Sequence, residues 1–481
     1  MQVRRAAGVA VGLVAVVAIL ASTAEFGAGE RVTLMVTHGT VVTMDANATV
    51  IPDGAVAIRG AEIVAVGTAQ DLAGRYHAPR TIDARGQLIL PGLINTHTHA
   101  PMVLYRGLAD DLALMDWLNK YIFPAEKATV SPEFVRVGTQ LAALEMIESG
   151  TTTFVDMYYF EDEIARVTRD AGLRAILGQS VIEFPVADAP TPADGLARAE
   201  RFIEQWKNDA LVTPAVAPHS AYTLDETALK AARALASRHD VPLLIHLAET
   251  RDEVGIIAKA HGRSPTAYLE SLGVWTGRSI AAHGVWLEPA DMTVLAARKV
   301  GVAHNPESNM KLASGVAAVP AWIARGMLAG LGTDGAASNN DLDMFEAMRQ
   351  AALLQKVASS NPEAMPARQA LELATRRGAE AVGLGDRIGS LEAGKQADLI
   401  TVSVDGARQT PLFDAISHLV YVAKGSDVRT TIVAGRVLMS DGRTHSLRRS
   451  TVLQEARAMA ENVRAAVGLA PVAKSEGSRV K

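Results

Sequence analysis

The 481-residue sequence predicts an α/β fold: a (β/α)8 barrel with a small composite β-sandwich built from N- and C-terminal segments. Three observations lead to this prediction. Short β-type runs separated by turn residues occupy about residues 30–90. Over residues 91–385, strand-like runs alternate with amphipathic helical stretches, a pattern typical of a parallel sheet and long enough for eight units. Short strands return over residues 386–446, so the two terminal segments can pair.

Individual segments carry each part of this prediction. The run "VTLMVTHGTVVTM" is rich in β-branched residues and indicates strands of the first β segment. In the middle region "TTTFVDM", "PLLIHLAE" and "LAGLGTDG" are strand-like, whereas "LDETALKAARALASRHD" has helical periodicity. The run "GKQADLITVSVD" begins the second β segment. Residues 447–481 predict a packed helix followed by a polar, disordered tail.

The N-terminus differs from the rest of the chain. Arg4 and Arg5 precede an apolar run over residues 6–21, and the small residues Ser22 and Ala24 follow it. Residues 1–29 therefore predict a secretory signal peptide cleaved near Ala24, or an uncleaved membrane anchor. Export to the periplasm or the medium is expected if the signal is real, and a cytoplasmic location otherwise. Membrane association is expected only if the segment is uncleaved.

Composition narrows the chemistry. With 47 Lys and Arg against 52 Asp and Glu, the net charge is −5, which offers no broad positive field for nucleic acid. Cysteine is absent, which excludes disulfides, thiolate nucleophiles and Cys-ligated zinc. Any metal must therefore bind His and carboxylate groups. The sequence leaves open whether the chain forms a homo-oligomer.

Two histidines form the strongest local feature. His97 and His99 alternate near the end of the apolar run "LILPGLINTHTH", and the period of a strand points both side chains the same way. In a barrel they would lie at the carboxyl ends of the strands, where active sites are built. Each alone could equally be a hydrogen-bonded polar residue, so the pair needs further partners to indicate a metal site.

Three further strand-like runs end in polar groups: His246 with Glu249, His283, and Asp334. Burying such groups unpaired is costly, and a shared metal removes that cost. The economical set takes His97 and His99 together with His246 and Asp334, leaving one position for water. Three imidazoles and one carboxylate suit Zn²⁺, while iron, manganese and cobalt stay open.

Several segments in order carry a resemblance to a known family: "PGLINTHTHAPMVLYRGLADDLALMDWLNKYIFPAE", "APHSAYT", "IHLAET", "HNPESNMKLASG" and "GTDGAASNNDLDMFEAMR". With them the chain resembles the amidohydrolase superfamily, in its 5'-methylthioadenosine/S-adenosylhomocysteine deaminase branch, which lies close to the triazine chlorohydrolases. The resemblance covers nearly everything after the leader. It implies a (β/α)8 barrel, a β-sandwich from both termini, one divalent metal per subunit, and hydrolysis of the 6-amino group of an adenine nucleoside to the inosine analogue and ammonia.

The resemblance also implies residue roles. Glu249 would shuttle a proton to the ring nitrogen and bind the base, and His283 would hydrogen-bond the attacking hydroxide. Asp334 would hold the metal, contact the substrate and relay a proton to ammonia. His219 is implied in substrate binding. The pattern around Glu126 by itself predicts an exposed helix residue, whereas the resemblance makes it an acceptor for ribose hydroxyls.

One departure bears on the substrate. Some members carry an Arg at the position of Gln179, available to a substrate carboxylate, and Gln cannot provide that charge. S-adenosylhomocysteine is therefore less secure as a substrate than 5'-methylthioadenosine, 5'-deoxyadenosine or adenosine. Arg174, earlier on the same strand, is expected to serve packing or a surface pair.

Loop residues and rival functions complete the prediction. Asn305 and Ser308 are expected mainly to shape a loop, and Asn339 and Asn340 to serve a turn or helix cap. One rival is a hydrolase of another C–N or C–Cl bond, such as a guanine-type deaminase or triazine hydrolase, with the same fold and metal. Another is a non-catalytic scaffold, against which retention of four ligands and Glu249 argues.

Overall fold

The structure is a computed structural model that describes residues 29–469. The predicted leader, apart from its last residue, and most of the predicted polar tail lie outside the described residues. Among the described residues, no helix combines the length and the apolar character needed to cross a membrane.

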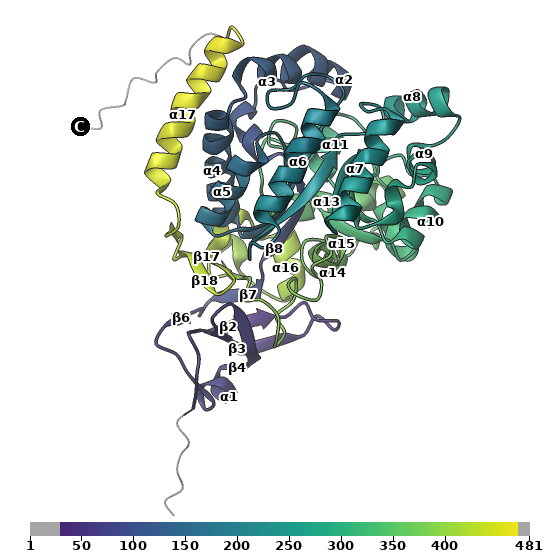
Figure 1. Ribbon diagram of the computed structural model, residues 1–481. Helices are drawn as coiled ribbons and strands as arrows, with labels where there is room; N and C mark the ends of the chain where they lie inside the picture. The colour runs from purple at the N-terminus through teal and green to yellow at the C-terminus, as the bar shows by residue number, and fades with distance from the viewer. Residues whose placement is uncertain (1–28, 470–481) are drawn as a thin grey trace, which may run out of the picture.

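Eight parallel strands form the central barrel (Figure 1). In order they are β8 (Leu93–Thr98), β9 (Thr151–Tyr158), β10 (Arg174–Val181), β11 (Val212–Pro218), β12 (Leu243–Leu247), β13 (Ser279–His283), β14 (Gly301–His304) and β15 (Leu328–Leu331). The last strand contacts the first, and Asp334 N, in the loop after β15, donates to His97 O of β8 at 3.0 Å. The predicted (β/α)8 barrel is confirmed.

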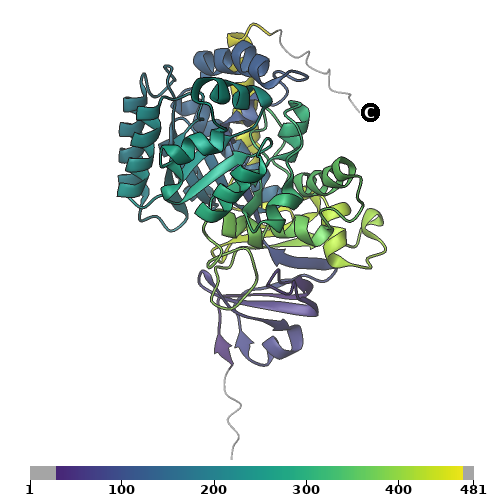
Figure 2. The same cartoon turned by 90° about the vertical axis from the view of Figure 1, so that its right-hand side faces the viewer.

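Helices surround the strands (Figure 2). Helix α7 (Glu226–Arg238) shows why they form: its N-cap Asp225 accepts from Ala228 N, and its buried face recurs with helical period. The other α-helices between strands are α2 (Leu114–Trp117), α3 (Phe123–Thr129), α4 (Pro132–Ser149), α5 (Glu161–Ala171), α6 (Pro192–Trp206), α8 (Arg251–His261), α9 (Pro265–Ser271), α10 (Pro289–Arg298), α11 (Pro306–Lys311) and α12 (Val319–Ala324). After β15 come α13 (Met344–Ser359), α14 (Ala367–Leu373), α15 (Arg376–Ala381), α16 (Ala415–Tyr421) and α17 (Arg449–Ala466). The C-terminal helix α17 packs against α4.

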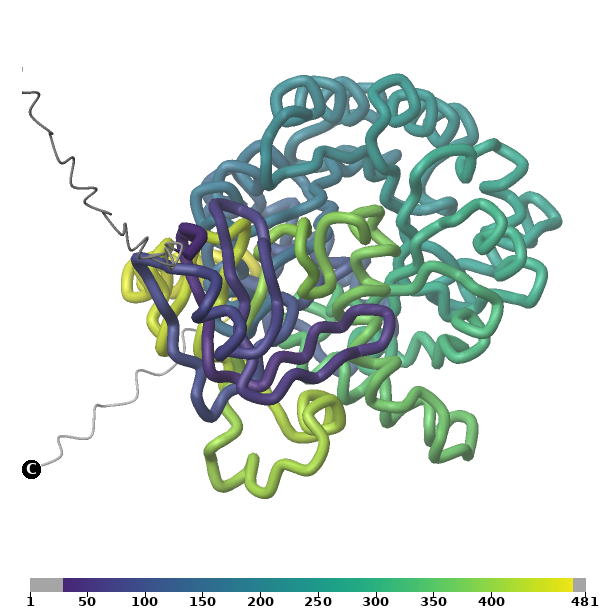
Figure 3. The backbone as a smooth tube through the Cα atoms, turned by 90° about the horizontal axis from the view of Figure 1, so that it is seen from below, coloured from purple at the N-terminus to yellow at the C-terminus, as the bar shows by residue number. Residues whose placement is uncertain are grey.

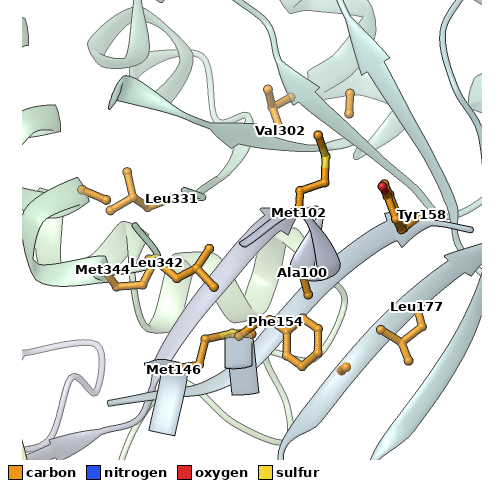
Figure 4. Packing of buried hydrophobic residues seen from close by; sticks show 14 of the residues in the cluster. Ala100, Met102, Met146, Phe154, Tyr158, Leu177, Val302, Leu331, Leu342 and Met344 are labelled. Carbon is orange, nitrogen blue, oxygen red and sulfur yellow. The ribbon is translucent and has the colours of Figure 1, made fainter. Parts of the chain in front are cut away.

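Alternation along each barrel strand divides the apolar residues between two cores. Val155 and Met157 of β9 point into the barrel interior, where they pack with residues of the neighbouring strands. Phe154 of the same strand and Leu177 of β10 point outward toward the helices (Figure 4). The barrel interior is therefore filled, which confines any ligand to the strand ends.

Strands from the N-terminal segment and from the segment before α17 build one β domain below the barrel (Figures 1 and 3). Strand β16 (Leu399–Ser403) pairs antiparallel with β7 (Gln87–Pro91), joining the C-terminal strands to the N-terminal ones. The other strands of this nine-stranded sheet are β2 (Leu34–Val42), β3 (Val50–Arg59), β4 (Glu62–Thr68), β6 (Thr81–Asp83), β17 (Val428–Val433), β18 (Arg436–Ser440) and β19 (Arg443–Thr444). Beside it lie α1 (Ala69–Ala73) and the pair β1 (Glu30–Arg31) and β5 (Tyr76–His77).

The chain passes from the β domain into the barrel at Gly92, between β7 and β8. A Cβ at this position would lie 2.1 Å from Thr152 Oγ1, so only glycine fits there. Nearby, Arg174 at the start of β10 donates to both carboxylate oxygens of Asp398, at 2.8 and 3.2 Å. Both side chains are buried, so the expectation that Arg174 serves packing or a surface pair is wrong: it forms a buried ion pair between barrel and β domain.

Candidate active site

Four of the predicted ligand atoms converge at the carboxyl ends of the barrel strands. Asp334 Oδ1 lies 3.3 Å from His97 Nε2 and 3.4 Å from His99 Nε2. His246 Nε2 in turn lies 3.3 Å from His99 Nε2. These side chains come from β8, from β12 and from the loop after β15, so the closed barrel alone brings them together.

Backbone carbonyls orient two of the imidazoles. His99 Nδ1 lies 2.6 Å from Met157 O, and His246 Nδ1 lies 2.8 Å from His219 O. A carbonyl can only accept, so each Nδ1 carries the proton and each Nε2 presents its lone pair to the centre. Metal-ligating histidines are typically held in this way.

The electrostatics of the cluster fit a cation. Burial lowers the pKa of His97 and, further, that of His246, so both imidazoles are neutral. Burial alone would raise the pKa of Asp334, but the adjacent His97 and the other surrounding imidazoles lower it well below its usual range. His97 Nε2 is buried without a hydrogen-bond partner among the described residues. Neutral nitrogens around one carboxylate are a donor set suited to a divalent metal.

Two serines hold the second oxygen of Asp334. Ser308 Oγ donates to Oδ2 at 2.7 Å and Ser338 Oγ donates to it at 2.8 Å. The expectation that Ser308 mainly shapes a loop is therefore incomplete, because it also orients a candidate ligand. Ser338 was missed by sequence reasoning, although it lies within the segment "GTDGAASNN" that carries the resemblance.

His283 lies beside this centre with its own support. Asn309 Nδ2 lies 2.9 Å and Asn305 Nδ2 3.3 Å from His283 Nδ1. An amide nitrogen only donates, so Nδ1 accepts and Nε2 bears the proton. That nitrogen faces Glu249 Oε2 at 3.8 Å. Asn305 therefore does more than shape its loop, and the role of Asn309 was missed.

Glu249 is placed by a second glutamate. Glu253, on α8, accepts from Ala248 N at 2.8 Å and from Glu249 N at 2.9 Å, while Thr250 caps the same helix. The pattern Thr-x-x-Glu after β12 is a capping signature and could have indicated Glu253. Burial, together with the charges of Asp334 and Glu253, raises the pKa of Glu249 well above its usual range. This shift favours the protonated acid form of Glu249.

Glu126 lines a cavity that residues of the histidine cluster also line. This cavity contains about 630 Å³ not filled by atoms, part of it open to solvent. Glu126 belongs to α3 (Phe123–Thr129) and is only 8% exposed, so the pattern-based expectation of an exposed residue is wrong. Tyr158 OH donates to Glu126 Oε1 at 2.7 Å. Burial raises the pKa of Glu126 to about 7.

The remaining predicted residues lie close by. The His219 ring is 4.7 Å from that of His246, and both line the cavity. Burial lowers the pKa of His219 to about 3, so it acts as a neutral hydrogen-bonding group. Gln179 is buried and donates to Asp188 Oδ2 at 3.0 Å, and Arg198 Nε lies 3.1 Å from the same oxygen. Asn340 has a left-handed backbone, with φ 81°, which fits the expected turn role, and its side chain accepts from Lys311.

The backbone turns left-handed at three strand ends around the site. Ala248, His283 and Asp334 have φ values of 48°, 78° and 65°. This conformation is uncommon for residues other than glycine and clusters at functional sites. The left-handed conformation changes the direction in which the side chains of His283 and Asp334 leave the backbone after their strands.

Fold and ligand geometry together define a (β/α)8 barrel with a candidate metal centre at the carboxyl ends of its strands. A family model described as the amidohydrolase family matches residues 88–438, and the chain belongs to this family.

The comparisons also find close relatives. The chain is 46% identical, over 90% of its length and 99% of the relative's, to a 5-methylthioadenosine/S-adenosylhomocysteine deaminase of Syntrophobacter fumaroxidans. It is 44% identical, over 89% and 98%, to a 5'-deoxyadenosine deaminase of Methanosarcina acetivorans. A zinc-bound crystal structure of an adenosine deaminase from Xanthomonas campestris superposes with a TM-score of 0.89 at 40% identity, covering 91% of this chain and all of that one.

Proposed function

We propose that this chain is a hydrolytic deaminase that converts the 6-amino group of adenine nucleosides to the inosine analogue and ammonia, using one Zn²⁺ per chain. The observation that carries the proposal is the convergence of three Nε2 atoms and Asp334 Oδ1. His99, His246 and Asp334 line the cavity that also contains the buried Glu126. The names of the relatives, all adenine nucleoside deaminases, support it.

His97, His99, His246 and Asp334 would hold the ion. When bound, such an ion lowers the pKa of water to about 7 and so supplies a nucleophile at neutral pH. The bound zinc of the structural neighbour supports this choice of metal.

The chain's own acids and bases move the protons. Protonated Glu249 donates to the ring nitrogen next to C6, and Asp334 takes one proton from the attacking water. The water oxygen bonds to C6, while His283 Nε2–H donates a hydrogen bond to it. Asp334 then passes its proton to the amino nitrogen, the C6–N bond breaks, and ammonia leaves. The second proton of the water returns to Glu249, which restores the acid.

Glu126 would bind the sugar. A carboxylate accepts hydrogen bonds from two adjacent hydroxyls, which favours nucleosides over free bases. Glu126→Ala should therefore raise KM for adenosine by about tenfold, a typical loss for a hydrogen bond to a charged group, while sparing activity on free adenine. Equal loss on both would remove Glu126 from the sugar site. His219 would hydrogen-bond the base.

The proposal separates substrates. Because Gln179 brings no positive charge, we expect 5'-methylthioadenosine, 5'-deoxyadenosine and adenosine ahead of S-adenosylhomocysteine. The test is ammonia release by purified, chelator-free enzyme from these nucleosides, guanine and a chlorotriazine, with elemental analysis of the same sample. Release from guanine or the triazine alone would favour the rival hydrolases. An active enzyme without a stoichiometric transition metal would remove the metal centre.

Export is a separate proposal. It depends on the pattern of Arg4, Arg5, the apolar run over residues 6–21 and Ala24, outside the described residues. N-terminal sequencing of the mature protein should begin shortly after Ala24, whereas an intact Met1 in the cytoplasmic fraction would contradict it.

A further inference from the structure

One buried carboxyl group outside the proposed ligand set holds the chain around a candidate ligand. Asp156, near the end of β9, is fully buried. Its Oδ1 atom accepts from Thr98 Oγ1 at 2.7 Å and from Ala100 N at 2.5 Å. The Thr98 hydroxyl has a second acceptor in Val155 O at 3.0 Å, but the shorter distance and the carboxylate favour Asp156. The two donors stand immediately before and after His99, so one oxygen holds the chain on both sides of this histidine.

The pairing of β8 with β9 is irregular at this point. Asn95 pairs with Phe154, and the next pair along the two strands is Thr98 with Asp156. Strand β8 therefore takes three steps where β9 takes two, so it contains one extra residue. Such a bulge changes the direction of side chains and often lies next to an active site. Because β8 ends at Thr98, the amide of Ala100 lies beyond the ladder and needs another acceptor, which Asp156 Oδ1 provides.

The same strand also holds the ring of His99. Met157, the next residue of β9, offers its carbonyl oxygen to His99 Nδ1 at 2.6 Å. Asp156 thus fixes the backbone around the ligand, and Met157 fixes the orientation of its imidazole. Groups of this kind, which do not touch the metal themselves, orient the ligands that do. Only Asp156 acts through its side chain, so only its contribution can be removed by substitution.

The second oxygen of this carboxyl group argues against a purely structural role. Asp156 Oδ2 is buried without a hydrogen-bond partner among the described residues. Leaving a polar atom unpaired in the interior lowers the stability of the folded chain. The placement of His99 gives a reason for a carboxyl group at a position where one of its oxygens does not serve stability.

We propose that Asp156 is a positioning residue for His99: by accepting from Thr98 and Ala100, it sets where the imidazole stands in the metal centre. This inference rests on the proposed metal centre of the deaminase and assigns to Asp156 a part in metal affinity, not in proton transfer. Replacement of Asp156 by Ala frees the chain on both sides of His99. Replacement by Asn keeps an oxygen that can accept from the same two donors.

The test measures the affinity of the folded, metal-free protein for Zn²⁺ by competition with a chromogenic chelator. Asp156→Ala should lower this affinity by about 10- to 100-fold, as loss of a group that orients a metal ligand typically does. Asp156→Asn should recover the greater part of that loss. The visible absorption spectrum of the Co²⁺-loaded protein, which reports the arrangement of the ligands, should change in Asp156→Ala and stay close to the native spectrum in Asp156→Asn.

Thr98→Val tests the same contact from the other side. It removes one of the two donors and leaves Asp156 in place, so the affinity for Zn²⁺ should fall by about three- to tenfold. Adding Asp156→Ala to this variant should lower the affinity less than it does in the native chain, because the two residues act through one contact. Thr153→Val is the matched control: Thr153 is a fully buried threonine of β9 whose hydroxyl has no hydrogen-bond partner among the described residues. Its affinity for Zn²⁺ should equal that of the native protein.

The outcomes separate this inference from the proposed function. Native affinity in Asp156→Ala would overturn the positioning role. An Asp156→Asn variant as weak as Asp156→Ala would also overturn it, because charge and not hydrogen bonding would then be responsible. Neither result would touch the deaminase function, which fails if the native protein binds no stoichiometric metal or releases no ammonia from adenine nucleosides. If Asp156→Ala does not fold, Thr98→Val decides, and native affinity in that variant would overturn the inference.

Discussion

At the amino ends of the barrel strands, Arg174 and Asp398 form a closed ion pair, and Asp398 Oδ1 also accepts from Ala434 N at 2.7 Å. At the carboxyl ends, His97 Nε2 has no hydrogen-bond partner among the described residues, and imidazole nitrogens face each other at 3.3 Å. Both regions are buried. The first satisfies its polar groups within the chain, whereas the second brings imidazole nitrogens and a carboxylate oxygen together without pairing all of them.

This difference distinguishes buried polar groups that stabilise the fold from buried polar groups that bind a ligand. A buried ion pair whose hydrogen bonds are all made within the chain contributes only to the folded structure. Its loss should therefore lower the free energy of unfolding and leave turnover unchanged. A cluster of buried polar groups without hydrogen-bond partners lowers the stability of the folded chain unless a ligand binds there. Substitutions in the two regions should therefore separate stability from activity.

The largest effect is expected at the amino ends. Asp398→Ala would leave the Arg174 guanidinium buried without its partner and should lower the free energy of unfolding by about 3–5 kcal/mol. Denaturant titration measures the loss, and kcat of the remaining folded enzyme should be nearly unchanged. Replacing both residues by Met and Leu should recover much of the stability. A double replacement as unstable as the single one would contradict the explanation by an unpaired charge.

The second largest effect is expected on turnover, from a substitution at the carboxyl ends of the barrel strands. Glu249→Gln cannot donate and recover a proton, so turnover should fall by at least about 100-fold. Metal content, measured by elemental analysis, should stay near one ion per chain, and the free energy of unfolding should not fall. Near-normal turnover would refute the proton-transfer role of Glu249. Glu455→Gln on the outer helix α17 is the matched control.

Glu253→Gln should have a smaller effect on activity. The amide offers one acceptor instead of two, so it releases either Ala248 N or Glu249 N and loosens the side chain of Glu249. We expect about a tenfold lower kcat with unchanged metal content, as misplacement of a catalytic group predicts. In an enzyme that already carries Glu249→Gln, adding Glu253→Gln should lower kcat very little further. Additive losses would show that Glu253 acts independently of Glu249.

The smallest expected effect is a pH dependence of substrate binding. Burial raises the pKa of Glu126 to about 7, so the fraction of carboxylate, the better acceptor for sugar hydroxyls, increases as the pH rises through 7. KM for adenosine should fall about threefold between pH 6 and pH 8. The variant Glu126→Gln should show no such change in KM. An unchanged pH profile in that variant would assign the titration to another group.

The barrel, and the meeting of four candidate ligand side chains at one end of it, could be predicted from sequence because they depend on local periodicity. Buried runs such as that before His246 end in polar residues, and a parallel barrel gathers such ends on one face. The pairing of β16 with β7 followed from similar short-strand patterns at both termini. The supporting contacts of Asn309 and Ser338 could not be predicted, because they depend on side chains meeting across loops.

Glu126 shows why a correct local pattern can mislead. Helix α3 continues from α2 (Leu114–Trp117) through η2 (Leu118–Ile122), a π-helical turn. Such a turn contains an extra residue and rotates everything after it relative to the helical period. A periodicity that assumes a regular helix therefore assigns Glu126 to the wrong face. The left-handed backbone at His283 and Asp334 was equally invisible, since neither is a glycine.

The order of the ligands along the chain has a consequence for biosynthesis. His97 leaves the ribosome early, whereas Asp334, whose amide closes the ring of strands by bonding to His97 O, follows more than two hundred residues later. A nascent chain therefore cannot bring the four proposed ligands together until nearly the whole barrel has been synthesised. The proposed metal would gain Asp334 as its last protein ligand.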